Sequence, residues 1–114
     1  MEAALRKNQR RRVPRIPVDF PVTLTWGRKR IRCRAREFSE FGILLTPPQK
    51  ELVGENIQLD LTLEPPSPAL SLSGVVVYAV DKGIGVRFEN VSPDQQAPLK
   101  NYVQARGIGI VKAN

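Results

Sequence analysis

Histidine is absent from this sequence of 114 residues, and cysteine occurs only once, at Cys33. A chain with one cysteine cannot form an internal disulfide, and without histidine it cannot build the mixed His/Cys sites that hold zinc. The Ser-His and Cys-His pairs that activate a nucleophile are excluded for the same reason. We therefore expect neither an enzyme nor a metal site, and the sequence indicates no cofactor.

Long hydrophobic runs are also absent. No segment approaches the roughly 18 consecutive apolar residues of a transmembrane helix, and the N-terminus lacks the apolar core of a secretory signal. Hydrophobic residues make up 41% of the chain and charged residues 25%, which is typical of a soluble globular protein. The length suits one domain, so the sequence predicts a single domain with no membrane insertion.

Acidic residues are scarce in the first third of the chain. Residues 1–36 hold twelve Lys and Arg against two acidic residues, a balance of +10, whereas residues 37–114 balance at −3. Clustered positive charge of this kind indicates an anionic partner. Four of the cations alternate along one predicted strand: Arg30, Arg32, Arg34 and Arg36. Such a stripe is typical of a solvated outer face, and the alternatives are that it steers anions or docks an acidic partner.

Period-two alternation of apolar and polar side chains predicts six strands. They are expected at residues 22–26, 30–36, 43–46, 57–63, 70–80 and 84–88, with a bulge or bend at Gly74. Ser92 and Gln95 have the spacing of a helix start, and Gly107 offers a stop. The sequence thus predicts an all-β fold, a small six-stranded antiparallel β-barrel with a C-terminal α-helix. The expected parts are a flexible basic N-terminal arm (1–9), the barrel domain including the helix (10–106) and a C-terminal tail (107–114).

Three motifs follow one another along this pattern. They are Arg-x-x-x-Arg (Arg11, Arg15), Glu-x-Ser-x-x-Gly (Glu37, Ser39, Gly42) and Gly-Ile-Gly-Val-Arg-Phe (83–88). In this order they resemble the PilZ domain family, whose signature is Arg-x-x-x-Arg followed by Asp/Asn-x-Ser-x-x-Gly. The resemblance covers residues 10–103. It implies a barrel of the split type that binds cyclic di-GMP, a bacterial second messenger, and that regulates motility or biofilm formation from the bacterial cytoplasm.

The resemblance assigns the arginines of the first motif to the nucleotide. Arg11 and Arg15 would contact guanine and phosphate, and Arg10 and Arg12 would add phosphate contacts. Arginine suits both groups, because its guanidinium forms paired hydrogen bonds with guanine O6 and N7 or with phosphate oxygens. The arm that carries these residues is expected to close over the nucleotide and present a new surface to a downstream protein partner.

The second motif supplies the barrel side of the expected site. Ser39 and Glu37 would contact the edge of guanine, whose N1–H and N2–H₂ groups are donors for a carboxylate. Gly42 would let the backbone turn without a side chain blocking the pocket, and Tyr78 is a candidate stacking surface. These residues are expected to meet at the mouth of the barrel, at one of its ends.

Position 37 departs from the family signature, because Glu replaces Asp or Asn. The extra methylene displaces the carboxylate by about 1.5 Å and adds rotamer freedom that binding removes, so weaker nucleotide binding is expected. The substitution supports an alternative, a PilZ-like adaptor that contacts proteins without nucleotide. A nucleic-acid-binding barrel is the third possibility, but aromatic platforms for single strands are not evident, and no DNA or RNA partner is expected. We expect a monomer or a weak dimer.

Overall fold

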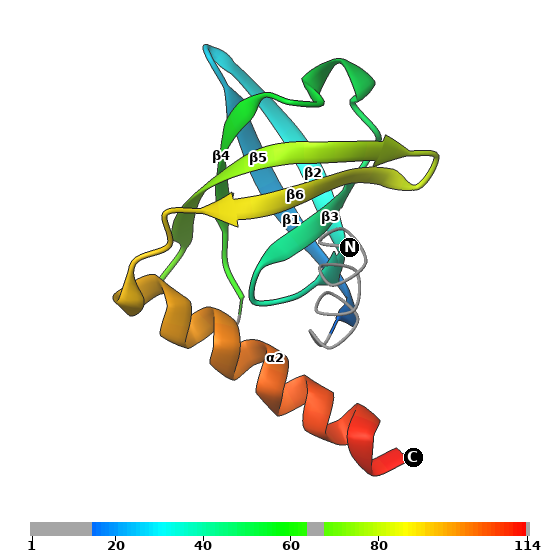
Figure 1. Ribbon diagram of the computed structural model, residues 1–114, viewed down its shortest axis with the longest axis vertical. Coiled ribbons are helices and arrows are strands. Elements are labelled where there is room, and N and C mark those ends of the chain that lie inside the picture. The colour runs from blue at the N-terminus through cyan, green and yellow to red at the C-terminus, as the bar shows by residue number, and fades with distance from the viewer. Residues whose placement is uncertain (1–14, 64–67, 114) are drawn as a thin grey trace, which may run out of the picture.

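The computed structural model describes residues 15–63 and 68–113, with side chains to residue 106. The protein is a closed β-barrel with one long helix across one end (Figure 1). The elements are β1 (Ile16–Trp26), β2 (Lys29–Phe38), β3 (Gly42–Thr46), the 3-10 turn η1 (Lys50–Leu52), β4 (Asn56–Leu61), β5 (Leu70–Val80), β6 (Gly83–Glu89) and α2 (Pro93–Ala113). Neighbouring strands are antiparallel, in the order β1-β2-β3-β6-β5-β4. This architecture confirms the predicted fold class, and the expected arm (1–9) lies outside the described residues.

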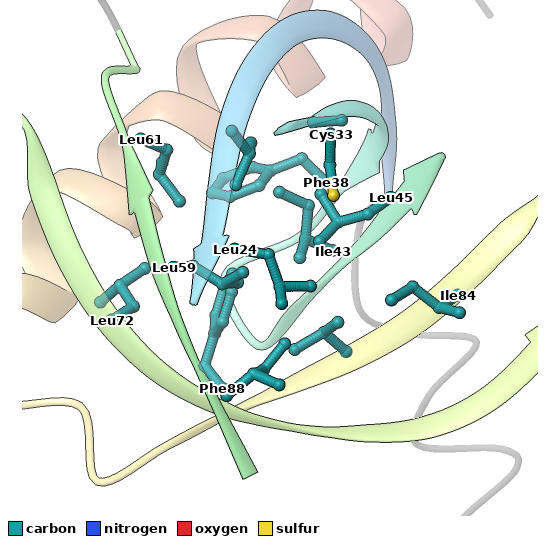
Figure 2. Packing of buried hydrophobic residues seen from close by; sticks show 14 of the residues in the cluster. Leu24, Cys33, Phe38, Ile43, Leu45, Leu59, Leu61, Leu72, Ile84 and Phe88 are labelled. Carbon is teal, nitrogen blue, oxygen red and sulfur yellow. The ribbon is translucent and has the colours of Figure 1, made fainter. Parts of the chain in front are cut away.

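Inward-facing side chains from all six strands fill the barrel, and Figure 2 shows part of this packing. Leu24 of β1, Leu59 of β4 and Ile84 of β6 are all fully buried. Successive side chains of a strand point to opposite faces, so a strand with one buried face must alternate apolar and polar residues. The alternation read from the sequence therefore marks the residues that form the core.

Strand β1 begins at Ile16, earlier than the start at Val22 that the alternation predicts. Pro17 and Pro21 conceal this first part of the strand, because proline has no N–H to donate to a neighbouring strand. Among the described strands, the first part of β1 pairs only with β2, and pairing with β4 begins at Val22. The prolines thus lie beside an unpaired edge, which is where a sheet tolerates them.

Strand β2 contains one extra residue at Arg36. Its neighbours Ala35 and Glu37 pair with consecutive residues of β3, so Arg36 has no partner in that ladder. A bulge of this kind shifts the alternation by one residue. Glu37 therefore joins Arg36 on the outer face, and Phe38 returns to the barrel interior, where it is 1% exposed.

Helix α2 begins with the capping arrangement that the sequence predicts. The Gln95 N–H donates to Ser92 Oγ at 3.3 Å, and the Ser92 N–H donates to Gln95 Oε1 at 3.3 Å. The Gln95 side-chain amide also donates to the carbonyl oxygen of Ser71 in β5 at 2.7 Å. Leu99 and Val103, which lie four residues apart on one face, are buried in the core. These contacts hold the first turns of the helix against the barrel.

Two glycines do not act as the sequence pattern indicates. Gly107 does not end α2, which continues to Ala113 through residues assigned to the tail (107–114). A single glycine costs a helix only about 1 kcal/mol relative to alanine, so it does not compel a stop. Gly74 does not mark the bulge of β5, because the register changes at Val77 instead.

Four aromatic rings meet where α2 covers the end of the barrel. Phe38 lies among them, with its ring centroid 5.6 Å from that of Tyr102 in α2, 6.1 Å from Phe20 in β1 and 6.0 Å from Phe88 in β6. Ring pairs in tilted or edge-to-face geometry stabilise a fold by about 0.5–1.5 kcal/mol each beyond their burial. Phe38 therefore connects three strands and the helix.

Replacing Phe38 by alanine is expected to lower the free energy of unfolding by about 3–5 kcal/mol, because a cavity replaces the ring that the other three contact. Phe41 is half exposed and offers a matched control three residues later. Phe41→Ala is expected to cost less than about 1 kcal/mol. Urea unfolding followed by circular dichroism measures both values. Equal losses would contradict the role given to Phe38.

Cys33 lies inside the barrel, 4% exposed, and burial raises the pKa of its thiol to about 11. Since the thiolate is the reactive form, native protein is expected to resist DTNB at about pH 8 and to react once unfolded. The native state keeps the thiol proton up to about pH 11, whereas the unfolded state releases it above about pH 9. Wild type should therefore lose stability relative to Cys33→Ala as the pH rises through this range. Immediate labelling of native protein would contradict this interpretation.

Candidate functional site

A cavity of about 570 Å³ lies on the outer wall of the barrel, over β3, β5 and β6 and beside the turn that joins β2 to β3. The predicted site residues that the structure describes all line this cavity: Arg15, Glu37, Ser39, Gly42 and Tyr78. These residues, which were expected to meet at the mouth of the barrel, lie instead along this outer cavity. Side chains of the core fill the inside of the barrel. The cavity lies outside it, and its lining combines outward residues with atoms of the core residues Phe38, Ile43 and Val86.

Ser39 shapes the turn between β2 and β3. Its Oγ accepts hydrogen bonds from the N–H groups of Phe41 at 3.2 Å and Gly42 at 3.1 Å, and its own N–H donates to the Gly42 carbonyl oxygen at 2.9 Å. Both acceptor positions of the hydroxyl are thus occupied. The hydroxyl itself donates to the Gly42 carbonyl oxygen at 3.4 Å, so it can donate to a ligand only by giving up this long hydrogen bond.

Gly42 is required because of a close approach rather than an unusual turn conformation. Its φ is not positive, so a left-handed backbone conformation does not explain the glycine. A Cβ at this position would lie 2.5 Å from the carbonyl oxygen of Val86 in β6. That carbonyl cannot move away without disturbing the β3–β6 ladder, in which Gly42 pairs with Arg87. The missing side chain therefore lets β6 pack against the turn.

A bulge at Val77 places two consecutive residues of β5 on the outer wall. Val76 pairs with Val86 and Tyr78 pairs with Gly85, so Val77 has no partner between them. Val77 and Tyr78 are 43% and 39% exposed, and both line the cavity. The Tyr78 ring lies so close to Gly85 that a Cβ there would overlap it. Glycine at position 85 thus makes room for the ring on the wall.

Among the further lining residues that escape the sequence prediction are Phe41, Val77 and Arg87. Phe41 is half exposed and adds a second aromatic surface. The Arg87 guanidinium donates to Glu89 Oε2 at 3.1 and 3.2 Å, which holds this cation in place. The third motif contains Arg87 and could have indicated it. Regular alternation already places Val77 outside; the bulge after it turns Tyr78 outside as well, and no signal in the alternation marks that bulge.

Charged groups of both signs reach the cavity. Arg15 directly precedes β1, and Glu37 follows the bulge of β2; neither makes a salt bridge within the described part of the chain. Both are available to a ligand that offers phosphate oxygens to the guanidinium and N–H donors to the carboxylate. The other predicted arginines, Arg10, Arg11 and Arg12, lie outside the described residues.

The described ranges contain no helix long and apolar enough to cross a membrane. No group of three or more His, Cys, Asp and Glu able to hold a metal ion occurs among the same residues. The described side chains of the cavity offer guanidinium, carboxylate, hydroxyl and aromatic groups.

Comparison with known families identifies the class of protein. The family model for the PilZ domain matches residues 9–105, which is most of the sequence. The chain belongs to the PilZ domain family. PilZ domains are non-catalytic receptors of cyclic di-GMP, which confirms the expectation that the chain is not an enzyme.

Ten chains among solved structures match the fold, and one is the inhibitor of motility MotI/DgrA of Bacillus subtilis, with a TM-score of 0.72 and 18% sequence identity. The match covers 89% of this chain and 52% of the other, so this chain spans about half the length of that protein. At this identity the likeness shows the fold. No curated protein matches the sequence.

Ser39→Ala is expected to lower the free energy of unfolding by about 1–3 kcal/mol, because the N–H groups of Phe41 and Gly42 lose their acceptor. Ser73 of β5, whose hydroxyl donates to Gln58 Oε1 at 3.2 Å on the exposed surface, is the matched control. Ser73→Ala is expected to change the same quantity by about 0.5 kcal/mol or less. Urea titration measures both variants. A Ser39→Ala protein as stable as wild type would show that the turn does not need this hydroxyl.

Proposed function

We propose that this protein is a receptor for cyclic di-GMP and that the cavity on the outer wall is the binding site. The observation that carries the proposal is convergence of the three motifs, which lie far apart in the sequence. Arg15 from the first, Ser39 from the second and Arg87 from the third line one cavity. Its volume of about 570 Å³ falls within the range typical of small-molecule sites.

The side chains of the cavity match the chemistry of the nucleotide. The Arg15 guanidinium can form two hydrogen bonds with a phosphate or with O6 and N7 of guanine. The Glu37 carboxylate can accept from guanine N1–H and N2–H₂. Tyr78 and Phe41 offer aromatic surfaces on which a purine can stack. These groups together recognise a ligand that is anionic, flat and rich in N–H donors, and cyclic di-GMP has all three properties.

Ser39 acts as a positioning residue in this proposal. Because its two acceptor positions serve the turn, it contributes at most one donated hydrogen bond to the nucleotide. Its main effect is indirect, through the turn that holds Gly42 against β6 and follows Glu37 in the chain. This role differs from the direct recognition of guanine expected for Ser39 from the family resemblance.

The arginine-rich arm completes the proposed site. Arg10, Arg11 and Arg12 precede Arg15 by three to five residues, a length of chain that lets them reach a nucleotide bound beside Arg15. Closure of the arm over the nucleotide would create a surface that a downstream protein partner in the bacterial cytoplasm can bind. Pro14 restricts the arm and thereby lowers the entropy lost on closure.

Isothermal titration calorimetry of the full chain with cyclic di-GMP tests the proposal. Arg15→Ala is expected to weaken binding at least about tenfold, because hydrogen bonds to charged groups contribute about 1.5–3 kcal/mol. Arg28→Ala, which removes an arginine from the β1–β2 turn outside the cavity, is the matched control and should bind like wild type. Glu37→Asp restores the family residue and is expected to bind more tightly than wild type.

Two outcomes would contradict the receptor proposal. Equal binding by Arg15→Ala and Arg28→Ala would place the nucleotide elsewhere. No heat from wild type and none from Glu37→Asp would favour the second candidate, a PilZ domain that contacts proteins without nucleotide. That second candidate is supported by Glu37, whose side chain is longer than the Asp or Asn of the family signature.

A further inference from the structure

A second cavity, of about 890 Å³, lies along the outer face of β2 and shares Glu37 and Leu44 with the first. Four cations line it: Arg32, Arg34, Arg36 and Lys82. None of the four belongs to the motifs that define the proposed nucleotide site. We call this cavity with its four cations the basic groove.

The fold gathers these cations from two segments that are distant in the sequence. Alternation along β2 puts Arg32, Arg34 and Arg36 on the outer face. Lys82 comes from the turn between β5 and β6, which lies near β2 because β3 pairs with both β2 and β6. The positive charge of the groove is therefore a product of the barrel topology.

Asp19 of β1 shows that arginines of the basic groove bind a carboxylate. Its Oδ1 lies 2.7 Å from Arg34 Nε and 3.5 Å from an Arg36 guanidinium nitrogen. The hydrogen bond from Arg34, together with the charges of Arg34 and Arg36, lowers the pKa of Asp19 below its ordinary value. One internal carboxylate thus bridges two guanidiniums. Arg32 and Lys82 have no salt bridge within the described part of the chain.

We propose that the basic groove docks an extended acidic segment of a partner protein. Outward arginines of β2 repeat every second residue, which is about 6.8 Å at a rise of about 3.4 Å per residue. Acidic side chains on one face of an extended segment repeat at the same interval, so several pairs can form at once. Apolar residues also line the groove and can contact the side chains between the acids: Pro17, Pro21, Leu44 and Pro47.

Two other anionic surfaces fit the basic groove less well. A membrane is broad and flat, whereas these cations line a concave groove. Single-stranded nucleic acid stacks its bases on aromatic side chains, and none of the described residues that line the groove is aromatic. An acidic peptide, which needs cations and an apolar wall, is the partner that the lining favours.

Fluorescence anisotropy with a fluorescein-labelled peptide, Glu-Thr-Glu-Leu-Glu-Thr-Glu, tests the proposal at low ionic strength. The titration contains no cyclic di-GMP, so its result does not depend on the proposed function. Asp19→Asn frees Arg34 and Arg36 and is expected to tighten peptide binding about 2- to 5-fold, the range of an exposed ion pair. The expected gain is informative, because a variant that merely unfolds would not bind better.

Loss of charge supplies the opposite test. The double variant Arg32→Gln, Lys82→Gln is expected to weaken peptide binding about tenfold, whereas Lys100→Gln, which removes an exposed cation from α2, should change it less than about twofold. Peptide affinity should also fall at high salt, because exposed charges are screened. Thermal melting by circular dichroism checks that each variant is folded.

Three results would overturn the proposal. The first is an Asp19→Asn protein that binds the peptide no more tightly than wild type. The second is a double variant that binds the peptide as well as Lys100→Gln does. The third is a single-stranded oligonucleotide, or a phosphatidylserine vesicle, that binds more tightly than the peptide and loses its affinity in the double variant. That result would assign the groove to nucleic acid or lipid.

Discussion

The bulge at Arg36 is the constraint on which the core and both cavities depend. Side chains of a regular strand alternate between its two faces, so β2 could not keep Arg36 and Glu37 outside and still bury Phe38. One unpaired residue resolves this conflict. Without it, Phe38 would leave the aromatic cluster that holds α2, and the carboxylate of Glu37 would point into the apolar interior, where burial of a charge is costly. The outer face would then lose the acid that lines both cavities.

A short segment after this bulge connects the stability of the barrel with its candidate site. Phe38 packs against the helix, Ser39 shapes the turn with its hydroxyl, and Gly42 lets β6 approach closely. The cavity therefore lies on paired strands and a hydrogen-bonded turn, and such support holds a site in position before a ligand arrives. The bulge at Val77 has the same effect in β5, where it turns Tyr78 to the outer face. The aromatic cluster and the cavity are two consequences of the same local geometry.

Much of this arrangement can be predicted from the sequence, because the period of a strand is visible in the order of its residues. Alternation predicts all six strands, and the motifs predict which segments meet at one cavity. The position on the outer wall depends on strand order, in which β6 lies between β3 and β5, and no local pattern contains that order. Bulges depend on the register of the partner strand, so neither Arg36 nor Val77 is marked in the sequence. The start of β1 is likewise concealed, because a strand accepts a proline such as Pro17 only beside an unpaired edge, and the local sequence does not show where that edge lies.

The central claim is that the outer wall of the barrel, rather than its end, is the receptor site for cyclic di-GMP. An NMR titration of the uniformly ¹⁵N-labelled full chain with the nucleotide tests it most directly. If the claim is correct, amide shifts concentrate on residues 37–42, on Val77 and Tyr78, and on residues 85–87, while the β1–β2 turn at Gly27 and strand β4 remain unchanged. No shift at saturating nucleotide, or shifts centred on the basic groove instead, would contradict the claim.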